Sequence, residues 1–241
     1  MDDRTKLVQV SQVNYVNGYR FDLKSLADIV HKHGAKLLAD ATQAVGALII
    51  DVKREEVDYL AAAPYKFLMG PAGLAFLYVK EEFVSELSPH RVGWKNQLWK
   101  GKYAEKPLKQ QETAEKIEYG TLYFEGIYGL ERSFEYINKI GINKIGMNTI
   151  ERRNLRLSDY LWNHLNNIGM KMFTPPETKS TIVSFYEGNA MELASKLMVQ
   201  KVKVSGRNTF GGHIRVSPHF YNTEANIDHF INRLIRLKKK L

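Results

Sequence analysis

The sequence predicts an α/β protein whose first part is built around a mostly parallel sheet. Over the first 80 residues, short apolar runs that favour strands alternate with a segment of helical periodicity. Such alternation favours parallel strands joined by crossover helices. Two of the runs end in a charged residue, Asp40 after 37–39 and Lys66 after 59–63. Because ligands of these sheets bind at the carboxyl ends of the strands, Asp40 and Lys66 are candidates for one shared site.

Local signals set the bounds of the elements in this first part. Asp22 is placed to cap a helix that runs to about His33, and Gly34 is its expected stop. A short helical turn around 43–46 follows Asp40. The expected strands are 6–10, 36–39, 58–63 and 74–79.

The pattern turns mainly helical beyond the polar, irregular segment 95–116, which is the best candidate for a loop. From Leu122, apolar periodicity predicts a helix that ends at Gly141. A longer helix is expected over about 143–167, with Ile150, Leu157, Leu161, Trp162 and Leu165 inward. The side chains expected on the buried face of the first of these helices are Phe124, Ile127, Tyr128, Leu130, Phe134, Ile137 and Ile140.

A smaller α/β unit is predicted after the two prolines at 175–176. Asn222 or Thr223 is expected to cap its last helix, because both residue types favour that position. The expected strands are 181–186, 203–205 and 213–216, and the expected helices are 190–200 and 223–237.

Composition excludes several classes of protein. The 241 residues are 44% apolar and 25% charged, as in ordinary globular proteins. No apolar run is long enough to span a membrane, and the first residues lack a signal-like core, so a cytoplasmic protein is expected. With no cysteine, disulfides, thiolate metal sites and a cysteine nucleophile are excluded, and no metal site is expected.

The net charge of +9 raises the question of nucleic-acid binding. The basic residues are scattered, and the one run, 238–240, lies at the end of a predicted helix, where cations complement the dipole. No nucleic-acid-binding motif accompanies them, so no nucleic-acid partner is expected.

An acid and a lysine at the ends of neighbouring strands suit a cofactor with a basic ring nitrogen and an aldehyde. Pyridoxal phosphate is such a cofactor: the carboxylate would keep the pyridine nitrogen protonated, and the lysine amine would form a Schiff base. Two ordinary explanations remain open from spacing alone. Asp40 is also a common type of turn or cap residue, and Lys66 could simply extend from a strand end into solvent.

The amino-acid sequence of these segments resembles that of the class V aminotransferase family. The resemblance rests on DATQAVG at 40–46, VDY at 57–59 and YKFLMGPAG at 65–73. Further matches lie at 10–18, 119–121 and 214–224, in the family's order. The family includes cysteine desulfurases, isopenicillin N epimerase-like proteins, kynureninases and aminotransferases.

This resemblance implies an aspartate-aminotransferase-like fold, the fold type I of pyridoxal-phosphate enzymes. Family members are normally longer upstream, so the chain resembles the C-terminal portion of the fold. The implied organisation is the C-terminal part of a large cofactor-binding domain at 1–140 and a small α/β domain at 141–241, joined by the long helix from about 143. A homodimer, or assembly with a separate N-terminal chain, is implied as well.

The resemblance also assigns roles around the cofactor. Lys66 matches the Schiff-base lysine, Asp40 the partner of the pyridine nitrogen, and Gln43 the donor to the 3-oxygen of the ring. Thr121 matches a threonine that reaches the cofactor phosphate of the other subunit. Tyr65 could donate its hydroxyl to the phosphate, as the Tyr-Lys pair of kynureninases suggests. On sequence alone, Gln43 could equally be a surface helix residue and Thr121 a helix cap.

The substrate would be an amino acid. Arg215 matches the arginine that binds the substrate carboxylate, a task suited to the guanidinium fork. Arg207 and Tyr15 lie where the family places residues near the substrate. Ala63 replaces a phosphate-binding serine, and no cysteine precedes Arg215, so cysteine desulfuration through a protein persulfide is excluded.

Two hypotheses about function follow. The first is a pyridoxal-phosphate-dependent enzyme that acts on an amino acid by transamination, epimerisation or lyase chemistry through Lys66. The second is a non-catalytic truncated remnant, or one half of a split enzyme that needs a separate N-terminal chain.

Overall fold

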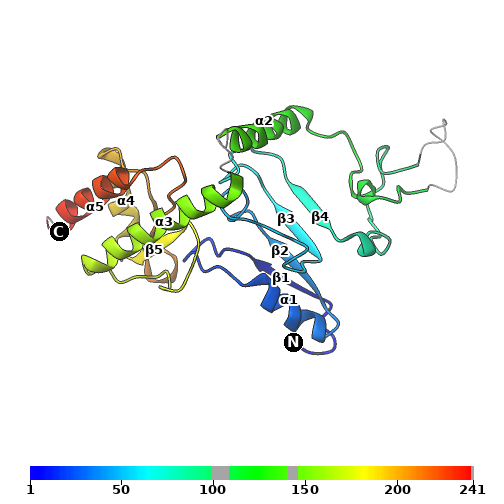
Figure 1. The fold of residues 1–241 in the computed structure, drawn as a ribbon, viewed down its shortest axis with the longest axis horizontal. Coiled ribbons are helices and arrows are strands. Elements are labelled where there is room, and N and C mark those ends of the chain that lie inside the picture. Colours follow the sequence, from blue (N-terminus) through cyan, green and yellow to red (C-terminus); the bar gives the residue numbers. More distant parts are fainter. Residues whose placement is uncertain (99–108, 141–145, 240–241) are drawn as a thin grey trace.

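The structure is a computed structural model that describes residues 1–98, 109–140 and 146–239. Two sheets lie side by side, with helix α3 running from one to the other (Figure 1). The first part contains β1 (Leu7–Ser11), α1 (Leu23–Lys32), β2 (Lys36–Asp40), β3 (Tyr59–Ala62), β4 (Phe76–Val79) and α2 (Phe124–Ile140). The second contains α3 (Gly146–Asn167), β5 (Val183–Tyr186), α4 (Ala190–Val199), β6 (Ser205–Arg207), β7 (His213–Val216) and α5 (Glu224–Lys238).

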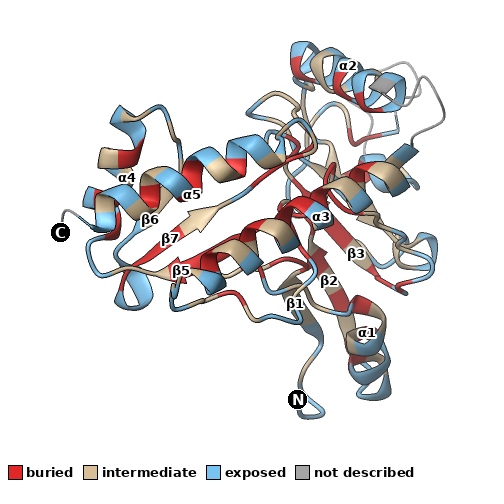
Figure 2. Cartoon of the chain, turned by 60° about the vertical axis from the view of Figure 1, so that its left-hand side comes forward, coloured by how far each residue is buried: buried red, intermediate tan, exposed pale blue. Residues whose placement is uncertain are grey.

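The first sheet has the order β1-β2-β3-β4. Strands β1, β2 and β3 are parallel, as expected, and β4 pairs with β3 in the antiparallel direction. The Asp22 side chain accepts a hydrogen bond from the Ser25 amide and caps α1, which ends at the predicted place. Buried side chains of α1 and of the strands form one continuous core (Figure 2).

The second sheet is antiparallel, with the order β5-β7-β6, and packs against α3, α4 and α5. Leu157, Leu161 and Leu165 of α3 are fully buried there, as their periodicity predicts. Thr223, rather than Asn222, caps α5 and forms a reciprocal capping box with Asn226. None of the helices in the described ranges is long and apolar enough to cross a membrane.

Four expected elements begin two residues later than predicted. Strand β4 begins at Phe76, not at Leu74, and β5 begins at Val183, not at Thr181. Strand β6 begins at Ser205, not at Lys203, and the preceding residues form an extended connection after α4. Helix α2 begins at Phe124, not at Leu122, so Thr121 lies outside the helix. The expected helix end at Gly141, the start near 143 and the domain boundary at 140/141 fall on or beside 141–145, which lie outside the described residues.

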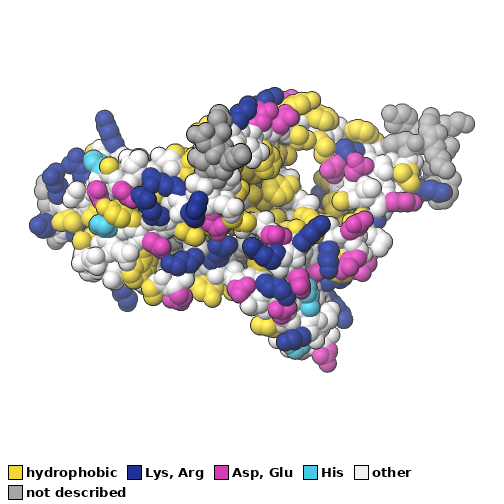
Figure 3. Space-filling view, in the orientation of Figure 1, with side chains coloured by type: hydrophobic (Ala, Val, Ile, Leu, Met, Phe, Trp, Pro, Cys, Tyr) yellow, Lys and Arg dark blue, Asp and Glu magenta, His cyan; other side chains and the backbone are white. Residues whose placement is uncertain are grey.

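The buried face expected for α2 is wrong over most of its length. Ile137 is buried, but Phe124, Ile127, Tyr128 and Phe134 are exposed. Tyr128 retains 66% of its accessible surface. Figure 3 shows hydrophobic side chains gathered along and beneath this helix. The periodic apolar face therefore exists, but the described part of the chain leaves it largely uncovered.

Three hydroxyl groups of the second part bind one short segment of the first. Ser184 donates to the carbonyl of Val16, and Ser180 donates to the carbonyl of Gly18, each at 2.6 Å. The Thr174 hydroxyl donates to the carbonyl between them, that of residue 17, also at 2.6 Å. Gly18 has φ +76, and a Cβ there would lie 2.1 Å from a backbone oxygen of Ile182. Only glycine permits this close approach.

Buried polar side chains fix the second part at another point. The ring Nε2 of His219 donates to the carbonyl of Phe67 at 2.8 Å, and Asn154 of α3 donates to the carbonyl of Ala47 at 3.0 Å. Both side chains are almost fully buried. Burial lowers the pKa of His219 below its ordinary value, and the hydrogen bond to Phe67 opposes this only in part.

This lowered pKa predicts a pH-dependent stability. Below about pH 6.5 the unfolded chain protonates His219 while the folded chain does not, so the free energy of unfolding should fall as pH decreases through this window. His219→Gln keeps a donor for Phe67 and cannot titrate. Urea unfolding of both proteins between pH 7.5 and pH 5 should show a smaller pH slope for the variant. Identical slopes would contradict the assignment.

Candidate active site

The carboxyl ends of the parallel strands meet at one cavity of about 480 Å³. Pairing places Ser11 opposite Asp40 and Asp40 opposite Ala61, so the chain exits from β1, β2 and β3 at the same edge. The cavity is lined by Ser11, Tyr15, Asp40, Thr42, Gln43, Ala63, Tyr65, Lys66, Arg207 and Arg215.

The turn after β2 holds the acidic end of the cavity. Asp40 accepts a hydrogen bond from the Thr42 amide through Oδ1 at 2.9 Å, which leaves Oδ2 for a ligand. The Thr42 hydroxyl accepts from the Ala63 amide at 3.1 Å and ties this turn to the end of β3. Gln43 follows on the same turn and is 8% exposed. A carboxylate and a buried amide therefore face the cavity from one rigid turn.

Lys66 lies in the turn that follows β3. The amide of Met69 donates to the carbonyl of Lys66 at 2.9 Å, and the amide of Gly70 donates to that of Pro64 at the same distance. Burial lowers the pKa of the Lys66 amine, the charge of Arg215 lowers it further, and Asp40 opposes both. A larger fraction of neutral, nucleophilic amine results than for an exposed lysine.

Arg215 extends from β7 and joins the two parts of the chain at the cavity. It donates to the carbonyl of Tyr15 at 2.9 Å. Its Nε is buried and has no hydrogen-bond partner in the described part of the chain. Burial and the charge of Arg207 lower the pKa of Arg215. A half-buried guanidinium with an unused donor is suited to bind a carboxylate or phosphate.

The lining residues fit the ring end of pyridoxal phosphate. Asp40 suits a protonated ring nitrogen, Gln43 a ring oxygen, and Lys66 an aldehyde. Three cations, Lys66, Arg207 and Arg215, face one carboxylate, so the cavity favours anions. The lining also contains four hydroxyl groups that can act as neutral donors, those of Ser11, Tyr15, Thr42 and Tyr65.

Most of the predicted site residues lie together at this cavity, and Thr121 does not. The seven that line it are Tyr15, Asp40, Gln43, Tyr65, Lys66, Arg207 and Arg215. Thr121 is exposed and does not line the cavity. Its role at the cofactor phosphate of another subunit stays a prediction.

Ser11 and Thr42 line the cavity without having been singled out from the sequence. The rule that ligands bind at the carboxyl ends of parallel strands could have found Ser11, because it ends β1. No group of metal-ligating side chains is present in the part of the chain that the structure describes.

Comparison with known proteins gives the family. The family model for class-V aminotransferases matches residues 1–230, so the chain belongs to that family. It is 31% identical to an uncharacterized aminotransferase of Bacillus subtilis (strain 168), YcbU, over 97% of this chain and 60% of the relative. It is 30% identical to a probable cysteine desulfurase of Pyrococcus abyssi (strain GE5 / Orsay), over 98% of this chain and 60% of that relative. The chain thus spans about 60% of the length of these curated relatives.

Solved structures confirm the predicted fold type I architecture. The apo cysteine desulfurase from Thermococcus onnurineus NA1 superposes with a TM-score of 0.87 at 26% identity, over 98% of this chain and 60% of that one. A variant of the lyase C-DES, with glycine linked to its pyridoxal-phosphate cofactor, has a TM-score of 0.87 at 23% identity, over 97% and 61%. The cofactor predicted from the sequence is the one that this lyase holds.

Removing the guanidinium next to Lys66 should change the reactivity of the amine. In Arg215→Ala, we expect the pKa of Lys66 to rise towards its ordinary value, because a like charge is lost and water enters the cavity. The pH dependence of labelling Lys66 with an amine reagent, read by mass spectrometry, measures this pKa. Arg207→Ala is the matched control, because Arg207 does not contribute to the shift of Lys66. An unchanged labelling profile in Arg215→Ala would contradict the electrostatic coupling.

Proposed function

We propose that the protein is a pyridoxal-phosphate-dependent enzyme that acts on an amino acid, with Lys66 as its catalytic residue. The observation that carries the proposal is the convergence of Asp40, Gln43, Lys66 and Arg215 at one cavity, from segments up to 175 residues apart. Membership of the class-V aminotransferase family supports it. The reaction would be transamination, epimerisation or a lyase reaction, and the absence of cysteine excludes a protein persulfide.

Each residue has a role set by its chemistry. When bound, pyridoxal phosphate supplies an electron sink for negative charge at the α-carbon of the substrate. Asp40 would hold the proton of the ring nitrogen, and Gln43 would donate to the 3-oxygen. Lys66, with its lowered pKa, would bind the aldehyde and then move the α-proton as a general base. Arg215 would bind the substrate carboxylate and orient it.

The absorption spectrum tests the role of Lys66. The purified protein, with excess cofactor, should show a visible band that persists through gel filtration and disappears on borohydride reduction. Lys66→Ala should lack this band and keep its circular dichroism and melting temperature, because Lys66 is partly exposed. A band of equal strength in Lys66→Ala would refute the assignment of the lysine.

Asp40→Asn separates binding of the cofactor from catalysis. The visible band should remain, because Lys66 is intact, while turnover should fall by at least about 100-fold, the usual scale for losing a positioned proton-holding group. Steady-state kinetics of the amino-acid reaction, together with the spectrum, measure both. Wild-type turnover in Asp40→Asn would remove Asp40 from the mechanism.

We propose further that activity needs a second polypeptide, either another copy of the chain or a separate N-terminal chain. The exposed apolar face of α2 supports this, and so do the two edge strands of the first sheet. Leu7 of β1 and Leu77 of β4 are exposed, and neither outer edge pairs with a strand in the described ranges. Apolar edges of this kind are normally covered.

Charged substitutions on α2 test this assembly. Ile127→Glu with Tyr128→Glu should leave the melting temperature of the isolated chain nearly unchanged, because both side chains are exposed. The same change should abolish dimers, or the complex with the N-terminal chain, in size-exclusion chromatography with light scattering. Ile29→Glu on α1, where the isoleucine is 55% exposed, is the control. A wild-type protein that is monomeric, colourless and unable to bind either partner would favour the remnant hypothesis.

A further inference from the structure

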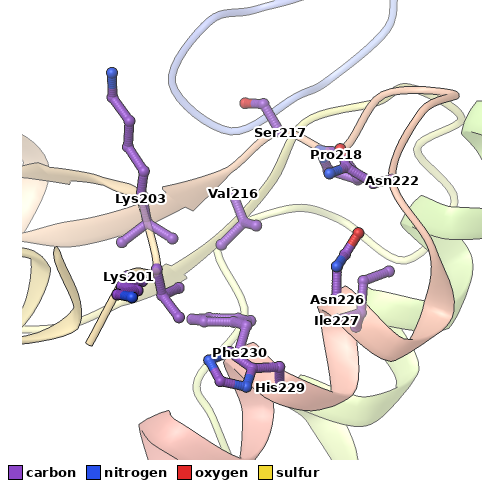
Figure 4. Close-up of a pocket in the computed structure, with 12 residues that line it drawn as sticks. Lys201, Lys203, Val216, Ser217, Pro218, Asn222, Asn226, Ile227, His229 and Phe230 are labelled. Carbon is purple, nitrogen blue, oxygen red and sulfur yellow. The ribbon is translucent and has the colours of Figure 1, made fainter.

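A second cavity, of about 360 Å³, lies in the C-terminal part of the chain (Figure 4). It is bounded by α5, by the end of β7 and by the extended connection that follows α4. It shares no lining residue with the cavity of Lys66. Its size is within the range of small-molecule sites. Its apolar lining consists of Val202, Val204, Val216, Pro218, Ile227 and Phe230.

The polar lining of this cavity contains cations and donors but no acid. Lys201, Lys203 and His229 line it, and neither aspartate nor glutamate does. None of these three side chains makes a hydrogen bond or ion pair with the described part of the chain, whereas many other lysines pair with carboxylates. In Figure 4, Lys203 extends away from the other labelled side chains.

Two asparagines add donors whose orientation is fixed. The Oδ1 atom of Asn222 accepts from the amide of His219 at 2.9 Å, and that of Asn226 accepts from the amide of Thr223 at 3.0 Å. Because both oxygens are occupied by backbone donors, each side chain must present its NH₂ group elsewhere. Both residues line the cavity.

Lys201 has a backbone conformation that lysine rarely adopts. Its φ is +62, at the position after the C-cap of α4. The amide of Val202 donates to the carbonyl of Leu197, and that of Lys201 to Met198, which is the Schellman pattern. Glycine is the usual residue at this position, because a Cβ is strained there. A strained cation at the edge of an apolar cavity points to a role for its charge.

We propose that this cavity binds a small organic anion, a carboxylate or phosphate attached to an apolar body, independently of the site at Lys66. The anionic group would lie between Lys201, His229 and the two asparagine amides. The apolar body would lie against Phe230 and the three valines of the lining. A lining without aspartate or glutamate avoids repulsion of the anionic group, and the apolar lining residues accommodate the apolar body.

Calorimetry on the full chain can test the site with three probes of one shape: phenyl phosphate, benzoate and the neutral benzyl alcohol. At least one anion should bind with a dissociation constant in the millimolar range or tighter, and the alcohol should bind at least about tenfold more weakly. Inorganic phosphate, which lacks the apolar body, should also bind more weakly than phenyl phosphate. The dissociation constants of phenyl phosphate and benzoate, compared with each other, show which anionic group the site prefers.

Lys201→Gly is the decisive variant, because it moves stability and binding in opposite directions. Removing the strained Cβ should raise the melting temperature, while loss of the cation should weaken binding of the anion about tenfold. Lys32→Ala, at an exposed lysine of α1 that lines no described cavity, is the control and should change neither. His229→Gln should weaken binding without changing the melting temperature, because the imidazole is exposed.

Three results would overturn the proposal. The first is no binding of either anion to the wild type, and the second is equal binding of benzyl alcohol. The third uses Arg215→Ala, which should not affect this cavity: if Arg215→Ala abolishes binding of the anion and Lys201→Gly does not, the probe occupies the other cavity.

Discussion

The contact between the segment 14–20 and the C-terminal part of the chain is the constraint on which the candidate active site depends. Hydroxyls of β5 and of the loop before it donate to consecutive carbonyls at 16–18, and Arg20 pairs with Glu151 of α3 at 3.0 Å. The carbonyl of Tyr15 then receives Arg215. Because Asp40 and Lys66 come from one sheet and Arg215 from the other, a shift of this segment would separate the cofactor end of the site from its carboxylate end.

The same contact gives the site its electrostatic character. Arg215 is half-buried where the two parts meet, and its charge lies close enough to Lys66 to lower the pKa of the amine. A lysine at the exposed edge of an isolated sheet would be solvated and mostly protonated. Chemistry at Lys66 is therefore a property of the docked pair of sheets, and not of the strand that carries it.

The sequence predicts local features well and long-range ones only through the resemblance. The capping of α1 by Asp22 and the exits of Asp40 and Lys66 at one sheet edge follow from short-range rules. The place of Arg215 does not, because nothing local in β7 says which surface its strand will meet. Periodicity likewise found the apolar face of α2 but could not say whether this chain covers it. The strand predicted at 203–205 lies two residues before the observed β6, because the turn at Lys201 has no glycine to mark the end of α4.

Helix α2 connects its uncovered face directly to the site. Ser133 on the inner side of α2 donates to the carbonyl of Met69 at 3.0 Å, and Met69 lies in the turn that carries Lys66. Leu130 of the same helix lies against Gly70, where an added Cβ would be only 3.2 Å from its side chain. A polypeptide that covers Ile127 and Tyr128 would hold α2 against this turn and exclude water from its outer side. Since desolvation is the largest cause of the lowered pKa of Lys66, covering α2 would strengthen the property that makes Lys66 suitable for catalysis.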